Sequence, residues 1–370
     1  MKILEKVRNS TVYEKVSRHF RYATLVEGFL KKEHYPFRCL FVDNTLLTRY
    51  LVPMIFEGEP RIVKKWMAWI PSIKKLIKDQ LSDLDMCIAD LPLQWEAEFQ
   101  GTYRYKSHGW VRQVIDIAEL GRSDKKVIKN TFKEAERRIR KNDFSYAIIH
   151  KLEEFKNFYY KMYLPLAKKR FGHLSLIQSY EDMERMLSEG HLLQVMQDGK
   201  VIAGAFNIVR DEVLIGHRLG VLDGREDLMK IGAQSAIYYF TIRYAQDQNI
   251  KKVDLSESRA FFKDGVYSHK RDWGASVYPC DKSRASVYFF FNPPYSEKMI
   301  SFFRNAPVII HAKAALTGLV GLDVGTELLD ETKKDLVRRF YSPGMQGLIL
   351  LVPHLKNPVE LSFENGQFTS

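Results

Sequence analysis

The sequence has few cysteines and no metal-binding pattern. Only Cys39, Cys87 and Cys280 occur in 370 residues, far apart and without a CxxC pair. This excludes a disulfide framework and a structural zinc site, since both need paired or closely spaced cysteines. The ten histidines show no HxxxH or HxH spacing, so no metal centre is indicated. We expect all three cysteines to be buried as small apolar side chains.

Long apolar runs are also missing. The most apolar stretch, residues 306–322, carries His311 and Lys313 near its middle and is shorter than the roughly 20 residues that cross a bilayer. The N-terminal region lacks the apolar run of a secretory signal. We therefore expect a cytoplasmic protein that is either free or peripheral to a membrane.

Acidic side chains are outnumbered, with 45 Asp and Glu against 57 Lys and Arg, which gives a formal charge of +12. Excess positive charge favours an anionic partner such as nucleic acid, a phosphorylated cofactor or a membrane surface. The hydrophobic content of 45% excludes a disordered chain. The length corresponds to two domains and an additional segment.

The first third of the chain predicts a mixed α/β structure. Residues 37–56 contain two β-rich runs around a turn at Asp43-Asn44. Residues 61–84 have apolar side chains at helical spacing, and residues 86–89 are typical of a short buried strand.

The clearest helix is residues 125–141 (KKVIKNTFKEAERRIRK), whose apolar side chains form one stripe. Its opposite side carries eight Lys or Arg against two Glu, among them Lys133, Arg137 and Arg140. This basic side is either a solvated helix face or a surface for phosphate groups. A second helix is expected at residues 151–170, kinked or ended by Pro165.

From residue 191 the hydrophobic pattern has period two, with Asp198-Gly199 as a hairpin turn. We expect three antiparallel strands, a helix capped by Asp227, one strand, a loop and a closing strand pair. The three strands are expected at residues 191–197, 201–209 and 213–221, and the helix at 227–249. The next strand is expected at 252–256, the loop at 257–274, and the closing pair at 275–278 and 286–291.

This order resembles the second half of a GNAT acyltransferase domain, and the sequence itself resembles the Fem-type aminoacyltransferases over residues 125–291. The resembling stretches are KNTFKEAERRIRKNDFSYAII, LEEFKNFYYKMYLPLAKKRFG, GHLLQVMQDGKVIAGAFNIVRDEVLIGHRLGVL and GVYSHKRDWG. Fem-type enzymes, like related envelope and polysaccharide acyltransferases, have two GNAT-like domains in tandem.

The resemblance implies an α/β (α+β) fold of tandem GNAT-like domains, each with a mixed, mostly antiparallel sheet flanked by helices. The expected domains are a diverged GNAT-like domain at 1–124, an acyltransferase domain at 125–295 and an extension at 296–370. The role of the extension is open: it packs on the second domain, or offers an apolar surface to a lipid-linked acceptor or a partner chain.

One motif departs from the standard GNAT acetyl-CoA loop, which reads Gln/Arg-x-x-Gly-x-Gly/Ala and cradles the pyrophosphate. The aligned residues 229–234 read MKIGAQ, where only Gly232 fits, although Lys230 and Arg225 supply charge. Fem-type enzymes take their acyl group from aminoacyl-tRNA. The resemblance therefore implies an aminoacyl-tRNA donor, with acyl-CoA as the alternative, and no tightly bound cofactor.

In GNAT-type transfer an amine attacks a thioester or ester while the enzyme relays a proton and stabilises the oxyanion. The expected place is the splayed edge between strands 213–221 and 252–256. Near it, we expect His217 to act as acid or base and Glu257 as base or amine-orienting carboxylate. The alternative for His217 is a half-buried structural histidine.

By resemblance, Lys270 corresponds to the family lysine that neutralises phosphate or developing negative charge. The alternative interpretation of Lys270 is a solvated lysine in a loop. The further candidates for a donor or phosphate subsite are Arg218, Arg225, Lys230, Gly232, Arg259 and Arg271.

These observations favour an N-acyltransferase that moves an aminoacyl or acyl group onto an amine of a cell-envelope precursor, amino sugar or peptide. One alternative is an acyl-CoA-dependent N-acyltransferase. Another, of a different class, is a non-catalytic module with a GNAT fold that binds RNA or an envelope partner. DNA is not an expected partner, and the oligomeric state stays open.

Overall fold

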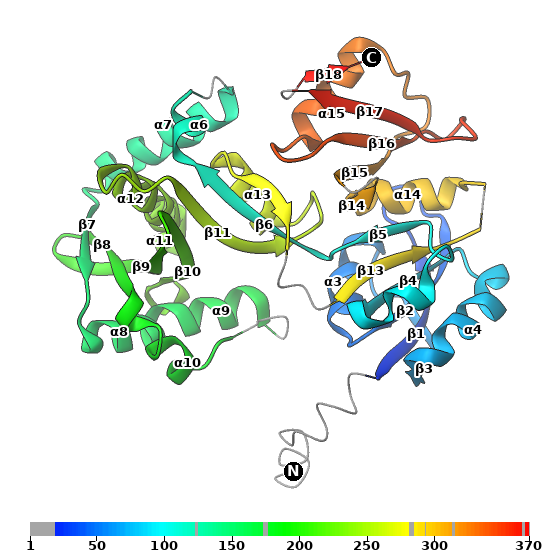
Figure 1. Ribbon diagram of the computed structural model, residues 1–370, viewed down its shortest axis with the longest axis horizontal. Coiled ribbons are helices and arrows are strands. Elements are labelled where there is room, and N and C mark those ends of the chain that lie inside the picture. The colour runs from blue at the N-terminus through cyan, green and yellow to red at the C-terminus, as the bar shows by residue number, and fades with distance from the viewer. Residues whose placement is uncertain are drawn as a thin grey trace, which may run out of the picture. The chain divides into compact units, whose positions relative to one another are not determined.

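The computed structural model describes residues 19–122, 125–172, 177–280, 285–292, 294–312, 315–364 and 367–369 (Figure 1). They form two compact units, each made of separate pieces of the chain. The first holds the described parts of Met1–Val111, Arg259–Tyr267 and Pro279–Ser370, and the second those of Arg112–Ser258 and Ser268–Tyr278. The linear domains expected from the sequence stay predictions, since evolutionary domains need not coincide with compact units.

The first unit contains a six-stranded sheet with the order β3-β1-β2-β4-β13-β5. The central pair β2 and β4 is parallel, and the other four neighbouring pairs of this sheet are antiparallel. The strands are β1 (Phe20–Phe29), β2 (Pro36–Asp43), β3 (Arg61–Trp69), β4 (Met86–Pro92), β5 (Tyr105–Ser107) and β13 (Ala285–Phe290).

Two helices cover the two faces of this sheet. Helix α3 (Leu46–Ile55) buries Leu47, Leu51 and Ile55 in one core, whereas α4 (Ile70–Gln80) buries its isoleucines in the other. Short helical turns follow at η1 (Leu81–Asp83), η2 (Leu93–Trp95) and α5 (Glu96–Phe99).

Two expected elements of the first unit were wrong. The second half of residues 37–56 is helix α3, because Leu47, Leu51 and Ile55 recur every four residues and face one core. Residues 61–69 form strand β3 rather than the start of a helix, and only α4 is helical. The expected strand at residues 86–89 is confirmed by β4.

The extension after residue 296 belongs to the first unit and forms a five-stranded sheet, β14-β15-β16-β17-β18. Its elements are α14 (Glu297–Asn305), β14 (Val308–Ala312), β15 (Ala315–Gly321), α15 (Asp330–Phe340), β16 (Gly347–Leu351), β17 (Val359–Glu364) and β18 (Gln367–Thr369). Phe302 of α14 stacks on Phe37 of β2 at 5.7 Å between ring centroids. The extension therefore shares a core with the first sheet.

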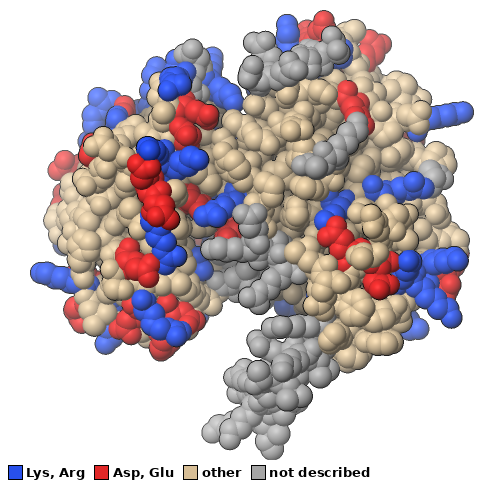
Figure 2. All heavy atoms as spheres, viewed as in Figure 1, with Lys and Arg blue, Asp and Glu red and all other residues tan. Residues whose placement is uncertain are grey.

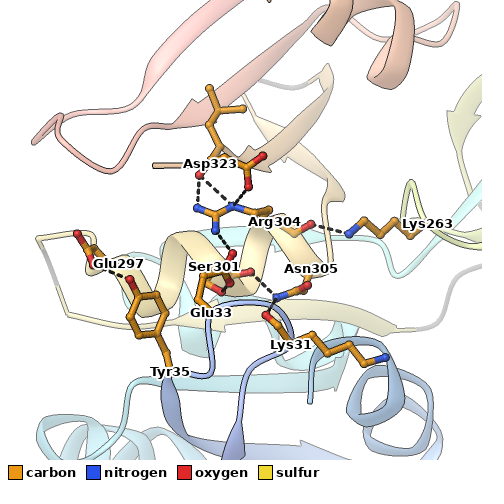
Figure 3. A network of polar contacts seen from close by, with 10 residues as sticks. Lys31, Glu33, Tyr35, Lys263, Glu297, Ser301, Arg304, Asn305 and Asp323 are labelled. Carbon is orange, nitrogen blue, oxygen red and sulfur yellow. Dashed lines mark hydrogen bonds and ion pairs between the residues drawn. The ribbon is translucent and has the colours of Figure 1, made fainter. Parts of the chain in front are cut away.

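A polar network ties α14 to its surroundings (Figure 3). The Arg304 guanidinium, which is 8% exposed, pairs with Glu33 and with Asp323. The carbonyl of Arg304 accepts a hydrogen bond from Lys263 Nζ at 2.8 Å. The neighbouring Asn305 donates to the carbonyl of Lys31 at 3.1 Å.

The second unit contains a seven-stranded sheet with the order β12-β6-β11-β10-β9-β8-β7. The strands are β6 (Trp110–Asp116), β7 (Ser145–Ile149), β8 (Gly190–Gln197), β9 (Lys200–Arg210), β10 (Val213–Val221), β11 (Lys252–Arg259) and β12 (Ser276–Pro279). The expected antiparallel meander of three strands is confirmed by β8, β9 and β10.

Helices cover this sheet too. Helices α7 (Lys126–Lys141) and α12 (Ala233–Asp247) pack on one another, which confirms the expected basic helix. The expected long helix at residues 151–170 contains a π-helical turn: α8 (Leu152–Phe158), η3 (Tyr159–Tyr163) and α9 (Leu164–Phe171). The remaining helical segments are α6 (Ile117–Arg122), α10 (Tyr180–Glu184), η5 (Leu187–Glu189), η6 (Leu222–Gly224), α11 (Glu226–Ile231) and α13 (Gly265–Asp272).

The expected closing strand pair was wrong. Strand β12 lies beside β6, whereas β13 lies between β4 and β5 in the first unit. The reason is that β13 is apolar on both faces, with Val287 and Phe289 in one core and Tyr288 and Phe290 in the other. Such a strand needs a central position in a sheet covered on both sides. Residues 281–283, where the turn was expected, lie outside the described residues.

Two findings bear on the absences noted above. All three cysteines are buried, as expected. Among the described residues, no helix is both long and apolar enough to span a membrane.

Candidate active site

The parallel strands β10 and β11 diverge in the second unit. They pair only from Val213 to Ile215 of β10 with residues 252–254 of β11. Beyond that point β10 has an irregular register at His217, and β11 turns at Ser256, whose φ is +62°. The expected splay at this edge is therefore confirmed, and it leaves backbone N–H and C=O groups beside a gap in the pairing of the two strands.

The turn at Ser256 is fixed by several hydrogen bonds. Its N–H donates to Asp254 Oδ1 at 2.8 Å, and its hydroxyl donates to the carbonyl of Gly216 on β10 at 3.0 Å. Asp254 is itself 1% exposed and accepts a hydrogen bond from Arg112 Nε at 2.6 Å. A non-glycine residue with positive φ costs free energy and persists only where its surroundings enforce it, as at active sites.

Lys270 lies at this turn, on helix α13 rather than in the expected loop. Its ammonium group donates to the carbonyls of Ser256 at 3.3 Å and Glu257 at 2.9 Å, and the residue is only 5% exposed. Lys270 is therefore not a solvated lysine. Its charge compensates the two carbonyl dipoles of the distorted strand.

Glu257 follows the turn and is half-buried. Among the described residues, its carboxylate has no hydrogen bond or ion pair, in contrast to that of Asp254 three residues earlier. A carboxylate that folding leaves unpaired beside a strand gap is available to a ligand.

His217 lies at the irregular position of β10. Its Nε2 donates to Gln178 Oε1 at 2.8 Å. The backbone of Gln178 is held by two tyrosines of η3: Tyr159 donates to its carbonyl at 2.9 Å, and Tyr163 accepts from its N–H at 3.1 Å. The π-helical turn thus orients the imidazole ring through one amide side chain.

This arrangement was not predicted from the sequence. Gln178 belongs to no motif, and Tyr159 and Tyr163 lie in a segment that predicts an ordinary helix. A π-helical turn often marks a functional site, but it is visible only in the backbone. Close packing explains Gly220 of β10, where a Cβ atom would lie 2.5 Å from the backbone of Met162 and Tyr163.

The other predicted donor residues have partners of their own. Arg218 donates to the carbonyl of His217 at 2.6 Å, Arg225 pairs with Asp227, and Arg271 lies 3.6 Å from Asp272. Their binding roles, with those of the exposed Lys230 and of Gly232 and Arg259, stay predictions. Gly232 has φ +107°, and a Cβ atom there would lie 2.8 Å from Cδ of Arg138 on α7.

The basic side of α7 is exposed at Lys133, Arg137 and Arg140, and Figure 2 shows Lys and Arg gathered over α6 and α7. Arg137 pairs with Glu134 at 2.7 Å. Among the described residues, Lys133 and Arg140 have no side-chain partner. The face therefore has charge that folding leaves uncompensated.

No protein-family model and no curated protein matches the sequence. Similar solved structures include the C-terminal domain of a putative lysylphosphatidylglycerol synthetase from Agrobacterium fabrum (9% identity, TM-score 0.37, 72% of this chain and 80% of that chain). Another is L-PGS from Bacillus licheniformis (12% identity, TM-score 0.36, 76% of this chain and 88% of that chain). A third is FemX (11% identity, TM-score 0.36, 74% of this chain and 85% of that chain). With identities this low, activity has to be inferred from the side chains of the site.

Proposed function

We propose that this protein is an N-acyltransferase that moves an aminoacyl or acyl group onto an amine. The observation that carries the proposal is the unpaired Glu257 carboxylate beside the splay of β10 and β11. Amine acylation needs a base for the amine proton and hydrogen-bond donors for the developing oxyanion. Glu257 supplies the first, and N–H groups beside the gap supply the second.

The reaction proceeds by direct attack. The amine nitrogen forms a C–N bond to the acyl carbon, and the C–O bond of an ester donor, or the C–S bond of a thioester, breaks. Glu257 takes the proton that the amine loses and returns it to the leaving oxygen or sulfur. The backbone donors are pre-oriented, so they stabilise the tetrahedral oxyanion without reorganising.

Lys270 and His217 have different parts in this proposal. Lys270 acts as a positioning residue, because its ammonium fixes the carbonyl of Glu257 and so the direction of that side chain. His217 is held by Gln178 at the bulge of β10, which suits a proton relay or a hydrogen bond to substrate.

The donor we favour is aminoacyl-tRNA, with acyl-CoA as the alternative. Arg138 packs against Gly232, where a GNAT enzyme would admit the pyrophosphate of CoA. Lys133, Arg137 and Arg140 form an exposed basic face suited to RNA phosphates. The acceptor would be an amine of an envelope precursor, amino sugar or peptide, and a lipid-linked acceptor would bring the protein to a membrane surface.

Two experiments test the proposal. Mass spectrometry of small molecules and RNA that co-purify with the protein should identify aminoacyl-tRNA or acyl-CoA. With that donor and an amine, Glu257→Gln and Lys270→Ala should both lose transfer. If both variants keep full activity, the assignment of the site is wrong. If RNA binds but no acyl transfer occurs with either donor, the protein is a binding module.

A further inference from the structure

A second cluster of ionisable side chains lies in the first unit, outside the site described above. The strands β2 and β4 are parallel, and Asp43 and Asp90 lie near their carboxyl ends. By strand alternation both carboxylates point to the face that α3 covers, and Asp43 does bond to Thr48 of α3. The carboxyl ends of parallel strands are a common place for ligands in α/β proteins.

Arg259 completes this cluster. Its guanidinium lies 4.2 Å from the ring centroid of Trp110 and 5.1 Å from that of Tyr50 on α3. The bond from Ala260 N to the carbonyl of Gly109, at 3.0 Å, keeps Arg259 beside Trp110. Two aromatic rings therefore hold the guanidinium plane in place.

Most members of the cluster have hydrogen-bond partners within the fold. Asp43 accepts from Thr48, Asp264 accepts from Tyr50 Oη at 3.0 Å, and Arg21 donates to the carbonyl of Asp90 at 2.8 Å. Among the described residues, the Arg259 guanidinium and the Asp90 carboxylate have no hydrogen bond or ion pair. One positive and one negative group thus have no hydrogen-bonded or ion-paired partner, and the guanidinium is held only by the two rings.

Both unpartnered groups are partly desolvated. Burial raises the pKa of Asp90 to about 6 and lowers the pKa of Arg259, and each is influenced by the charge of the other. Both residues are half-buried rather than fully enclosed. Guanidinium pairs best with a planar oxyanion, and a carboxylate with an ammonium group.

We infer that this cluster binds a small ligand that carries both an ammonium group and an oxyanion, with Arg259 on the oxyanion and Asp90 on the ammonium. An α-amino acid carries these two groups, with a carboxylate as the oxyanion. An amine with a phosphate group carries them too, with the phosphate as the oxyanion. A purely anionic ligand is disfavoured, because three carboxylates surround the two arginines. The inference rests on the proposed function only in that such a ligand would be the amine acceptor or its headgroup.

Calorimetric titration tests the inference without any acyl transfer. The probes are the twenty standard L-amino acids and phosphoethanolamine, with amino-acid amides and N-acetyl amino acids as counterparts that lack one charge. At least one zwitterionic probe should bind, and its amide and N-acetyl forms should bind at least about tenfold more weakly. A preference between amino acids and phosphoethanolamine distinguishes carboxylate from phosphate.

The variants locate the site. Arg259→Gln and Asp90→Asn should each weaken binding about tenfold or more, and Arg259→Lys, which keeps the charge, should weaken it through loss of the planar fork. The control is Arg49→Gln, an exposed arginine on α3, which should bind as the wild type does. Arg259→Lys also serves if Arg259→Gln does not fold.

Two results would overturn the inference: no probe binds the wild type at millimolar concentration, or a probe binds the Arg259 and Asp90 variants as tightly as the wild type. Its failure is separable from that of the proposed function. Binding without acylation of the bound amine rejects the enzyme and keeps the subsite. Acylation of an amine that binds independently of Arg259 and Asp90 keeps the enzyme and rejects the subsite.

Discussion

Two carboxylates three residues apart have opposite situations. Asp254 is buried in an ion pair with Arg112 and fixes the turn at Ser256, whereas Glu257 is half-buried with no partner among the described residues. The residue type alone does not distinguish a structural from a catalytic carboxylate. What distinguishes them is whether the fold already satisfies the oxygen atoms.

This contrast gives a matched pair of variants. Glu257→Gln should lower kcat by about 10²–10⁴, the usual contribution of a general base, with little change in stability. Asp254→Asn should instead cost about 3 kcal/mol of unfolding free energy, because it removes the buried carboxylate charge that pairs with Arg112. Transfer assays and urea denaturation of both variants measure this. A Glu257→Gln protein as active as the wild type would contradict the assigned role.

His269 on α13 gives a prediction for pH. It is a neutral acceptor for Trp273 Nε1 at 3.3 Å, and burial lowers its pKa to about 4. The unfolded chain, with a histidine pKa near 6.5, therefore binds more protons between pH 6.5 and 4, so stability is complete above pH 6.5 and is lost as pH falls through this range.

From pH 7 to pH 5 the loss from His269 is about 2 kcal/mol. The variant His269→Gln removes the titrating group and should lose that much less stability over the same interval. Denaturation curves at both pH values measure the difference. His191, whose pKa is also lowered to about 4, is present in both proteins and cancels. Equal losses in both proteins would exclude the neutral buried His269.

At the scale of elements, the π-helical turn η3 and strand β10 are packed without space between them. The variant Gly220→Ala places a Cβ atom 2.5 Å from the η3 backbone, so the turn must move. We expect a loss of about 1–3 kcal/mol and, because Tyr159 and Tyr163 hold Gln178, reduced activity through His217. The control is Gly121→Ala on α6, where nothing lies within 4 Å of an added Cβ.

Helix α14 depends on its buried ion pair in the same way. The variant Arg304→Met leaves Glu33 without its partner and should cost about 3 kcal/mol in thermal or urea denaturation. The double variant with Glu33→Gln should recover part of that loss, since it removes the unpaired charge. Lys298→Met, on the same helix, breaks the more exposed pair with Asp85 and should cost less than about 1 kcal/mol. Equal costs at both positions would contradict the buried role of Arg304.

The sequence predicted those elements whose periodicity is local. The strands around Asp198-Gly199 and helix α7 show their burial pattern within one segment. Strand β13 could not be placed, because its partners β4 and β5 lie far away in the chain. At the site, Lys270 was found by resemblance and Glu257 by its position after a short strand, whereas Gln178 acts only through three-dimensional contacts.

At the scale of the whole molecule, part of the net charge of +12 is concentrated on helix α7. Reversal of Lys133, Arg137 and Arg140 to Glu should weaken tRNA binding. It should also reduce the slope of log K against log salt by up to about 0.9 per lost phosphate contact. Filter binding at several salt concentrations measures both. The control reverses Lys74, Lys75 and Lys78, exposed on α4, and changes net charge equally. If both triple variants behave alike, the α7 face is only solvated.

The placement of β13 also has a consequence for synthesis. The first sheet needs residues 285–290 between β4 and β5, so a nascent chain holds those two strands without their shared partner for on the order of ten seconds or more. All pieces of the second unit leave the ribosome earlier. We therefore expect the second unit to fold first, while chaperones bind the unpaired strands β4 and β5. Proteolysis of ribosome-bound chains exposed up to residue 280 should spare the second unit and digest the first. Equal digestion of both would exclude this order.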